Sequence, residues 1–438
     1  MPENNMAINT AEFSLEEWFD YIQTLHHREI ELSLERVKTV YNRMHPSGLR
    51  FKVISVAGTN GKGSTSELIS SIYRGAGYQV GKFTSPHLIN FNERFNLNGK
   101  PVSDKHLLNA FINVEANRKD TPITFFEYGT LVAVELFVNA QVDIAVMEIG
   151  LGGRLDSVNI LDPDIAIVTS VSIDHAAWLG DTIDKIAYEK VGIARANRPL
   201  LIGFPDAPKT MLNYAKEIDA ELNLVGQEFG FKESKSAGTW EWFGSKRVLK
   251  NLPLPFDQGD VQLANCSLAL QSVDLLSDSL PVSEPHVRQG IVSAHIDGRC
   301  QIISKSPLVV LDVAHNQASV ARLSEFVSAQ LGPDSGRVIA ICGMLADKQV
   351  SQSLESISSL IDSWHVATIH NERGAKSDDL DKSIKLVSNA EVNVYDYVVD
   401  AFKTVKADLK FNDCLVVFGS FHIVGDILSF IRKKEADT

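Results

Sequence analysis

Short apolar runs recur along the first half of the chain, and segments with helical periodicity separate them. Leu68, Ile69 and Ile72 fall on one face of a predicted helix that ends near Gly75. Strands that alternate with helices predict a parallel α/β sheet. Four runs, rich in β-branched residues and ending in small or polar ones, are the expected strands: FKVISVAG (51–58), VDIAVMEIG (142–150), DIAIVTSVS (164–172) and PLLIGF (199–204).

A second series of strand-like runs begins near residue 301. The stretch from about 205 to 260 interrupts the pattern with Trp240, Trp242 and several turn residues, and it predicts a hairpin-rich insertion. A domain boundary is expected near His295–Gln301, where AHIDGRCQ breaks the alternation. The second series comprises LVVLDVA (308–314), RVIAICGM (337–344), SWHVATIH (363–370), EVNVYDYV (391–398) and CLVVFGS (414–420).

Composition narrows the class of protein. The 438 residues carry 42 basic and 55 acidic side chains, a net charge of −13, whereas duplex nucleic acid is bound through basic surface. We therefore expect no nucleic-acid partner. The four cysteines are far apart, the first residues lack the pattern of a signal peptide, and no apolar run could span a membrane. These features predict a cytoplasmic protein without a membrane partner.

A glycine-rich loop follows the first expected strand and opens the first helix. In such a loop the backbone N–H groups approach phosphates, the helix N-terminus favours anions and a lysine neutralises charge. The loop departs from the standard P-loop because Val56 replaces its first glycine. The alternative is a glycine-rich turn with an exposed lysine. The expected phosphate-binding residues are Gly58, Thr59, Asn60, Gly61, Lys62, Gly63, Ser64 and Thr65.

Polar side chains stand where later strands of the sheet end. Ser85, Glu148 and His175 supply a hydroxyl, a carboxylate and an imidazole. Ligands of open α/β sheets bind beyond the carboxyl ends of the strands, so these groups could hold Mg²⁺ beside bound phosphates. The alternatives are structural: His175 as a helix cap or core histidine, and Glu148 as a paired buried acid.

Two further groups carry candidate chemistry. Lys190 lies in EKVGI (189–193), where the alternative is a solvated face of glutamate and lysine. Arg299 lies in the expected boundary stretch, and Asp312 and His315 follow the first expected strand after it. These side chains suit a site that domain closure completes.

Together these segments resemble the successive motifs of folylpolyglutamate synthases, within the Mur ligase superfamily. The resemblance covers nearly the whole chain and implies an ATP-dependent amide ligase of the α/β class. It implies a P-loop NTPase-like parallel-sheet domain over residues 1–296 and a smaller Rossmann-like domain over 297–438. The motifs are GTNGKGS (58–64), SPH (85–87), EIGLGGRLD (148–156), DH (174–175), EKVGI (189–193), DGR (297–299), DVAHN (312–316) and FGSFH (418–422).

Two more segments, LSLERV (32–37) and TFFEYGT (124–130), resemble the branch that also has dihydrofolate synthase activity. In that branch such segments line the dihydropteroate pocket. Phe126 could pack against a flat pterin, with a place in the core as the alternative. The resemblance implies that the substrate is contacted by Leu34, Thr124, Phe126, Gly153 and Arg154.

The resemblance also implies roles in catalysis. Lys62 would bind the β- and γ-phosphates, with Ser64 or Thr65 assisting. Mg²⁺ would be held by Ser85, Glu148 and His175, and Lys190 matches a lysine that is often carbamylated. Nucleotide and glutamate would be contacted by Gln262, Asn265, Arg299, Asp312 and His315. Three positions depart from the family pattern: Val261, where a histidine is expected, and Val313 and Gln317 near the Asp312 motif.

The expected reaction activates the carboxylate of dihydropteroate, or of a reduced folate's glutamyl tail, as an acyl phosphate. L-Glutamate then attacks to form an amide. ATP is the co-substrate and Mg²⁺ the cofactor, and we expect a monomer. Three alternatives remain: a folylpolyglutamate synthase without the first activity, another Mur-type ligase such as one for peptidoglycan precursors, or a nucleotide-operated switch without ligation.

Overall fold

The computed structural model describes residues 10–28, 30–234, 238–255, 260–346 and 350–436. The chain divides into two compact units. The N-terminal unit contains the residues up to Ser85 and Phe91–His295, and the C-terminal unit contains Pro86–Asn90 and the residues from Ile296 onward. No pattern in the sequence indicated that Pro86–Asn90 belongs with the second unit.

In its described residues the N-terminal unit contains an eight-stranded sheet with the order β4-β3-β2-β5-β1-β6-β7-β8. The strands from β2 to β8 in this order run parallel, and β3 and β4 add an antiparallel edge. The sheet strands are β1 (Lys52–Ala57), β2 (Val80–Phe83), β3 (Phe95–Leu97), β4 (Lys100–Pro101), β5 (Ile144–Glu148), β6 (Ile165–Val168), β7 (Pro199–Ile202) and β8 (Glu221–Leu224).

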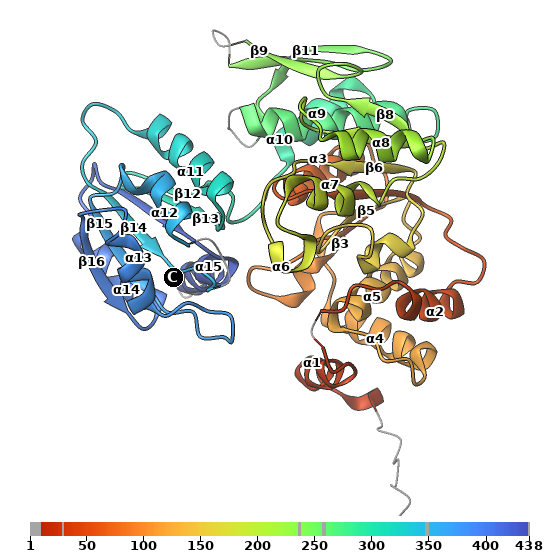
Figure 1. The fold of residues 1–438 in the computed structure, drawn as a ribbon, viewed down its shortest axis with the longest axis horizontal. Helices are drawn as coiled ribbons and strands as arrows, with labels where there is room; N and C mark the ends of the chain where they lie inside the picture. The colour runs from red at the N-terminus through yellow and green to blue at the C-terminus, as the bar shows by residue number, and fades with distance from the viewer. Residues whose placement is uncertain (1–9, 29, 235–237, 256–259, 347–349, 437–438) are drawn as a thin grey trace, which may run out of the picture. The chain divides into compact units, whose positions relative to one another are not determined.

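Helices cover both faces of this sheet (Figure 1). One core includes residues of α1, α2, α4, α5, α7 and α8, and the other includes residues of α3, α9 and α10. The helices are α1 (Leu15–Thr24), α2 (Glu35–Met44), α3 (Lys62–Gly75), α4 (Asp104–Arg118), α5 (Phe125–Asn139), α6 (Ala176–Leu179), α7 (Ile183–Val191), α8 (Lys209–Glu217), α9 (Asp260–Leu275) and α10 (Glu284–Ser293), with 3-10 turns at Thr10–Glu12, Phe91–Arg94 and Ser157–Ile160.

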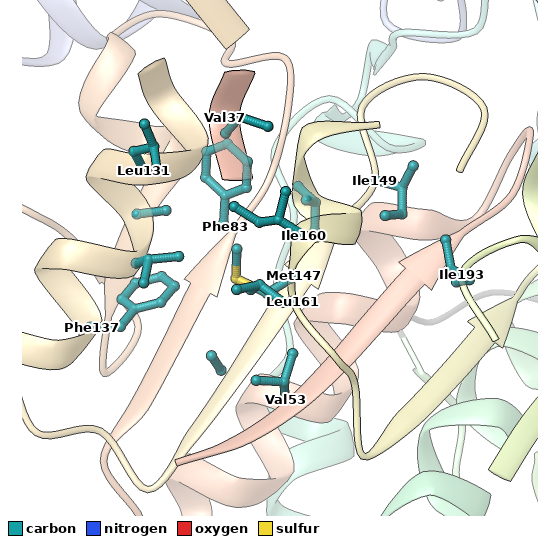
Figure 2. Packing of buried hydrophobic residues seen from close by; sticks show 14 of the residues in the cluster. Val37, Val53, Phe83, Leu131, Phe137, Met147, Ile149, Ile160, Leu161 and Ile193 are labelled. Carbon is teal, nitrogen blue, oxygen red and sulfur yellow. The ribbon is translucent and has the colours of Figure 1, made fainter. Parts of the chain in front are cut away.

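The alternation of side chains along the central strands explains the two cores. Val53 and Met147 point into the first core, where Figure 2 shows them with Phe83 and Leu161. Ile54, a neighbour of Val53 along β1, is buried in the second core. Parallel strands that are buried on both faces have nearly continuous apolar sequences, and this is why the sequence revealed them.

The region from 205 to 260 is only partly the predicted insertion. Its first part forms α8 and β8, and β8 pairs parallel with β7 as the last strand of the main sheet. The second part forms the expected hairpins, β9 (Gly230–Ser234), β10 (Thr239–Phe243) and β11 (Val248–Pro253), in an antiparallel sheet. Trp240 and Trp242 are fully buried in this part.

The C-terminal unit contains a six-stranded sheet in its described residues, with the order β12-β13-β17-β14-β15-β16. All neighbours are parallel except β12, which is antiparallel to β13. Cores on both faces pack the strands against helices. The elements are β12 (Gln301–Lys305), β13 (Leu308–Asp312), α11 (Gln317–Gln330), β14 (Val338–Cys342), α12 (Val350–Ser358), β15 (Ser363–Ala367), α13 (Ser377–Ile384), β16 (Glu391–Tyr395), α14 (Val398–Asp408), β17 (Cys414–Phe418) and α15 (Phe421–Ala436).

The predicted α/β class is therefore confirmed, with a large sheet unit followed by a smaller one. Each apolar run that the sequence marked contains a strand. Among the described residues, no helix combines the length and the apolar character that crossing a membrane would require.

Candidate functional site

The glycine-rich loop connects the end of β1 to the start of α3. Gly61 has φ +88° and Gly58 has φ +149°, and both values are unfavourable for residues with a Cβ. A Cβ on Gly58 would lie 2.0 Å from Thr169 Oγ1. The loop therefore needs glycine at these positions both for its conformation and for its close contact with the end of β6.

Hydrogen bonds fix the loop to the residues that follow β6. The backbone N–H of Asn60 donates to Ser170 Oγ over 2.9 Å, and the Asn60 carbonyl accepts from Thr169 Oγ1 over 2.6 Å. The Lys62 ammonium donates to the carbonyl oxygens of Gly58 (3.0 Å) and Thr59 (3.3 Å). The lysine thus lies over its own loop at the N-terminus of α3, where a helix favours anions.

Gln262 and Asn265 of α9 lie beside this loop. Asn265 Oδ1 accepts from Thr65 Oγ1 over 3.4 Å, and Asn265 Nδ2 donates to Gln262 Oε1 over 3.1 Å. A Cβ on Gly61 would lie 2.5 Å from Asn265 Oδ1. The structure therefore brings together two predicted nucleotide-binding segments that are about 200 residues apart in sequence.

Glu148 ends β5 next to β1 and is 5% exposed. Its Oε2 accepts a long hydrogen bond, 3.4 Å, from the backbone N–H of Ser85, and it would lie 3.9 Å from a Cβ on Gly63. Burial lowers the pKa of Arg94 to about 10, and the nearby Glu148 carboxylate partly opposes this shift. Glu148 and Ser85 are thus neighbours at the first turn of α3, and sequence reasoning missed the basic residue beside them.

His175 occupies the N-cap position of α6 in a left-handed conformation, with φ 51°. Its side chain makes no capping hydrogen bond, and its Nε2 lies 4.0 Å from Asp174 Oδ2. His175 therefore stands at the helix-cap position that the alternative expected, but its imidazole does not form the capping hydrogen bond.

The donor chemistry around Glu148 fits a hard divalent cation. Mg²⁺ keeps several waters and takes few protein ligands, usually carboxylate oxygens beside substrate phosphates. The described residues contain no group of three or more His, Cys, Asp or Glu side chains arranged as a complete metal site. Glu148, next to the loop, supplies a buried carboxylate of the required kind.

Lys190, at the end of α7, is 4% exposed, so the alternative of a solvated face does not hold at this residue. Burial, with a smaller effect of the Lys62 ammonium, lowers the pKa of its ammonium to about 7. The carboxylates of Asp174 and Asp156 act in the opposite direction. The structure thus brings Lys190 near the phosphate-loop lysine and near two acids that lie in the recognised motifs but were not among the expected site residues.

Asp156 is one of these acids and lies at the end of the loop that follows β5. Its two oxygens accept from the backbone N–H groups of Leu151 (2.8 Å) and Val158 (2.9 Å). Burial nevertheless raises its pKa to about 6. Asp156 belongs to the GLGGRLD motif, so the motif was the signal that could have identified it.

Gly153 and Arg154 dock this loop on the end of α7. A Cβ on Gly153 would lie 2.6 Å from the carbonyl oxygen of Glu189, and Arg154 Nη2 lies 2.8 Å from Glu189 Oε1. The Arg154 guanidinium also lies 5.4 Å from the centre of the Tyr188 ring. These contacts show that Arg154 helps to hold the loop against α7. Its contact with substrate stays a prediction.

Three of the five residues expected to contact the substrate lie at the starts of two helices. Leu34 is the N-cap residue of α2 and packs against the first core. Thr124 caps α5 in a capping box with Glu127, and Phe126 lies in the first turn. The Phe126 ring is partly buried, with its centroid 5.9 Å from that of Phe83. Phe126 thus borders the core without being fully buried in it.

Arg299, Asp312 and His315 lie close together in the C-terminal unit. Asp312 ends β13 and accepts from the backbone N–H groups of Cys300 and Ala314, each over 2.6 Å. The Arg299 guanidinium lies 5.5 Å from the centre of the Phe421 ring, and the His315 ring centroid lies 6.4 Å from it.

The C-terminal group contains a further basic residue that sequence reasoning missed. Burial lowers the pKa of Arg322, and the nearby Arg299 lowers it further, while Asp312 opposes both. Arg322 lies one helical turn or more beyond the DVAHN motif, within α11. Arg322 lies outside the recognised motifs, in a sequence that is typical of a helix, so no motif could have indicated it.

Two family models match the chain. The Mur ligase middle domain matches residues 56–238, and the Mur ligase glutamate ligase domain matches residues 298–421. The dihydrofolate synthase/folylpolyglutamate synthase of Escherichia coli is 39% identical over 96% of this chain and 96% of its own length. The chain belongs to the dihydrofolate synthase/folylpolyglutamate synthase family. This confirms the resemblance of its motifs.

Other members of the dihydrofolate synthase/folylpolyglutamate synthase family agree. The Haemophilus influenzae protein of this name is 35% identical over 98% of this chain and all of its own length. A structure described as E. coli FolC in complex with DHPP and ADP has a TM-score of 0.91 and 38% identity, and the match covers 97% of this chain and 99% of the other. The alternative of a peptidoglycan-precursor ligase loses its support.

A further solved family member is a bifunctional folylpolyglutamate synthase/dihydrofolate synthase with Mn, AMPPNP and L-glutamate bound. It has a TM-score of 0.87 and 36% identity, and the match covers 96% of this chain and 99% of the other. This dihydrofolate synthase/folylpolyglutamate synthase fold therefore accommodates a nucleotide, a divalent metal and glutamate in a close relative.

Proposed function

We propose that this chain is an ATP-dependent ligase that adds L-glutamate to dihydropteroate and to the glutamyl tails of reduced folates. The observation that carries the proposal is the loop Gly58–Gly61, which is fixed to the end of β6 and places Lys62 at the N-terminus of α3. This arrangement suits the phosphates of ATP. The relatives with the same name and similar fold support the substrate classes.

The first step transfers the γ-phosphoryl group of ATP to a substrate carboxylate, giving ADP and an acyl phosphate. The Lys62 ammonium, the loop N–H groups and the hydroxyls of Ser64 and Thr65 hold the phosphates and offset their developing charge. Asn265 accepts from Thr65 Oγ1 and donates to Gln262 Oε1, and this pair of α9 residues would position the nucleotide. These are the residues that we expect to control ATP binding.

Glu148 would hold Mg²⁺ together with Ser85 and His175. When bound, Mg²⁺ would neutralise phosphate charge and orient the γ-phosphoryl group. Glu148 is buried and its Oε2 would lie 3.9 Å from a Cβ on Gly63, so its carboxyl group is next to the phosphate loop.

The second step is attack on the acyl phosphate by the neutral amine of L-glutamate. The C–N bond forms, inorganic phosphate leaves, and the amine loses a proton. We propose that Arg299 and Asp312 contact nucleotide or glutamate. We also propose a catalytic role for His315, whose Nδ1 donates to the Val313 carbonyl over 2.9 Å, so that the orientation of its ring is fixed.

On the other substrate, we propose that Leu34, Thr124 and Phe126 bind the pterin end of dihydropteroate, and that Gly153 and Arg154 shape the adjoining loop. The support is the position of Phe126 at the border of the core, beside Phe83 and the Gly150 backbone. A flat pterin can stack on such an aromatic ring.

We further propose that Lys190 is carbamylated. Only a neutral amine attacks CO₂, and the lowered pKa of Lys190 makes a large fraction of it neutral near pH 7. The resulting carbamate is an anion that Lys62 would stabilise and that could order the magnesium or acyl-phosphate site. A mass increase on the peptide that contains Lys190 would support this assignment, and an unmodified mass in CO₂-saturated buffer would contradict it.

We propose that the protein acts as a cytoplasmic monomer. The wide spacing of Cys266, Cys300, Cys342 and Cys414 along the sequence supports a reducing compartment. Sedimentation of the purified protein would test the monomer directly.

The ligase proposal is tested by phosphate release. We expect ATP turnover to require L-glutamate together with dihydropteroate or tetrahydrofolate. Turnover without either substrate would favour a nucleotide-operated switch. Turnover with tetrahydrofolate but not with dihydropteroate would leave a folylpolyglutamate synthase alone.

A further inference from the structure

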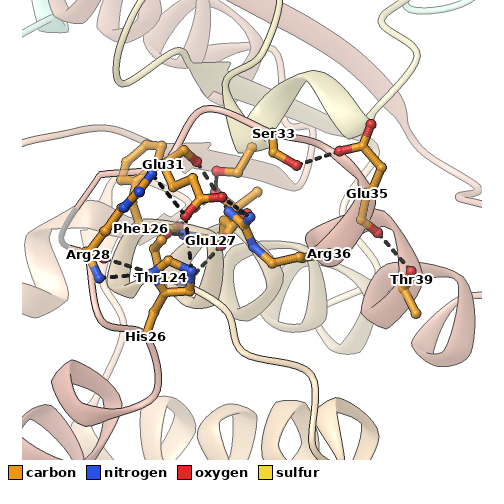
Figure 3. A network of polar contacts seen from close by, with 12 residues as sticks. His26, Arg28, Glu31, Ser33, Glu35, Arg36, Thr39, Thr124, Phe126 and Glu127 are labelled. Carbon is orange, nitrogen blue, oxygen red and sulfur yellow. Dashed lines mark hydrogen bonds and ion pairs between the residues drawn. The ribbon is translucent and has the colours of Figure 1, made fainter. Parts of the chain in front are cut away.

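A series of ionic contacts holds the connection between α1 and α2, whose described residues have no regular secondary structure (Figure 3). His26 Nε2 lies 3.3 Å from Glu31 Oε2, and Arg36 Nη1 lies 2.9 Å from Glu31 Oε1. Arg36 Nη2 in turn lies 3.0 Å from Glu127 Oε1. The contacts therefore run from the connection, through the first turn of α2, to the first turn of α5.

Glu127 serves two partners with its two carboxylate oxygens. Oε2 accepts from the backbone N–H of Thr124 over 2.7 Å and completes the capping box of α5, while Oε1 pairs with Arg36. The Glu127 side chain is only 4% exposed. A buried carboxylate is costly without a partner, and Arg36 is the cation that faces this one.

The turn that Glu127 holds is the turn that carries the predicted pterin contacts. Thr124 and Phe126 lie three residues and one residue before Glu127. The Phe126 ring has close neighbours. A Cβ on Gly150 would lie 2.4 Å from Phe126 Cζ. The ring centroid of Phe83, the last residue of β2, lies 5.9 Å from that of Phe126. A small rotation of this turn would therefore move both the ring and the Thr124 hydroxyl.

We propose that Arg36 and Glu127 are positioning residues for dihydropteroate. Their ion pair fixes the connection between α1 and α2 against the first turn of α5, so that Leu34, Thr124 and Phe126 are held in one arrangement before the pterin binds. Neither residue touches the reacting atoms. This inference rests on the proposed function and adds to it two residues that act through their neighbours.

The test compares Arg36→Met with a matched control, Arg43→Met. Arg43 lies on the same helix, but its guanidinium donates to the carbonyl oxygens of Asn117 and Arg118 and to Thr121 Oγ1 at the end of α4. For Arg36→Met we expect KM for dihydropteroate to rise about tenfold, with kcat and the KM values for ATP and glutamate within about twofold of wild type. Arg43→Met should leave all four unchanged.

Two conservative variants separate positioning from folding. Arg36→Lys keeps one charge contact and should recover part of the lost affinity. Glu127→Gln can still accept from the Thr124 N–H but loses its charge, so it should reproduce the rise in KM with little change in melting temperature. Because the two residues act as one pair, the double variant Arg36→Met/Glu127→Gln should be no worse than the more affected single variant.

Several results would overturn the proposal. One is an unchanged KM for dihydropteroate in Glu127→Gln, and another is an equal rise for all three substrates. A third is a double variant whose effect is the product of the two single effects. If Arg36→Met does not fold, Arg36→Lys and Glu127→Gln decide the question. If wild-type protein itself fails to ligate glutamate, the proposed function fails instead, and the two failures are thus distinguishable.

Discussion

The balance of charge around Lys190 sets its chemistry. Its side chain is buried, and the Lys62 ammonium disfavours a second positive charge nearby, so its pKa falls to about 7 although Asp174 and Asp156 oppose the shift. An exposed lysine would have a pKa of about 10.4 and would be almost wholly protonated at neutral pH. The buried position therefore supplies the neutral amine that reaction with CO₂ requires.

This lowered pKa predicts a pH-dependent stability. Between the folded and unfolded pKa values the unfolded chain binds one more proton, so the cost of burying Lys190 should be greatest below about pH 7 and should decrease as pH rises from about 7 to about 10. In CO₂-free buffer, the unfolding free energy of wild type should rise by about 1 kcal/mol per pH unit relative to Lys190→Met between about pH 8 and 9. Denaturant titrations at several pH values measure this difference. Parallel curves for the two proteins would contradict the burial of a charged amine here.

Lys62 and Glu148 are predicted to act on phosphate transfer rather than on folding. Lys62→Ala removes the cation over the loop, and Glu148→Ala removes the buried carboxylate at the first turn of α3. We expect kcat to fall about 100-fold or more in each variant, while circular dichroism and melting remain close to wild type. Near-normal turnover in either one would refute its place in the site.

At the scale of elements, the loop that follows β5 depends on its docking to the end of α7. Gly153 allows this contact because its backbone approaches the carbonyl oxygens of Glu189 and Lys190, at 2.6 and 2.9 Å from where a Cβ would stand. These are backbone atoms, so neither can rotate away as a side chain could. A side chain at position 153 must therefore displace the loop or the end of α7.

Gly153→Ala is predicted to lower kcat about tenfold or more, because it shifts the turn that carries Lys190. Gly332→Ala is the matched control, since a Cβ there meets nothing within 4 Å. Steady-state rates and melting temperatures of the two variants provide the comparison. Equal activity of Gly153→Ala and Gly332→Ala would show that the close docking is dispensable.

The elements show what the sequence could reveal. The buried parallel strands and the loop at Gly58–Thr65 were predicted because each has a local signature: a continuous apolar run, or glycines and a lysine between a strand and a helix. β8 was missed because its four residues, ELNL, are short and partly polar and look like part of an insertion. Its place in the sheet depends on pairing with β7, which is not a local property.

The same reasoning applies to the site residues. The proximity of Asp156 and Lys190 requires one loop to dock on a helix more than 30 residues later, and the Arg36–Glu127 pair joins residues 91 positions apart. Single-sequence patterns cannot encode such contacts. Asp156, Arg36 and Glu127 all lie in segments that the sequence marked, but the contact between Arg36 and Glu127 emerged only from the folded chain.

At the scale of the whole molecule, a chain with a net charge of −13 must bind anionic substrates through local groups of basic side chains and backbone N–H groups. In the N-terminal unit these are the Lys62 loop and the N-terminus of α3, with Arg94 nearby. In the C-terminal unit, Arg299 and Arg322 supply a second concentration of positive charge. The net charge argues against nucleic acid as a partner but did not indicate either local site.

The most direct test of the central claim is mass analysis of the products formed from dihydropteroate, ATP, Mg²⁺ and L-glutamate. We predict a new species whose mass equals dihydropteroate plus one glutamate minus one water, formed together with one ADP and one phosphate per amide bond. Omission of ATP or glutamate should abolish it. Unchanged dihydropteroate in the complete mixture, under conditions where tetrahydrofolate is extended by glutamate, would contradict the dihydrofolate synthase assignment, and no ligation of either substrate would contradict the account as a whole.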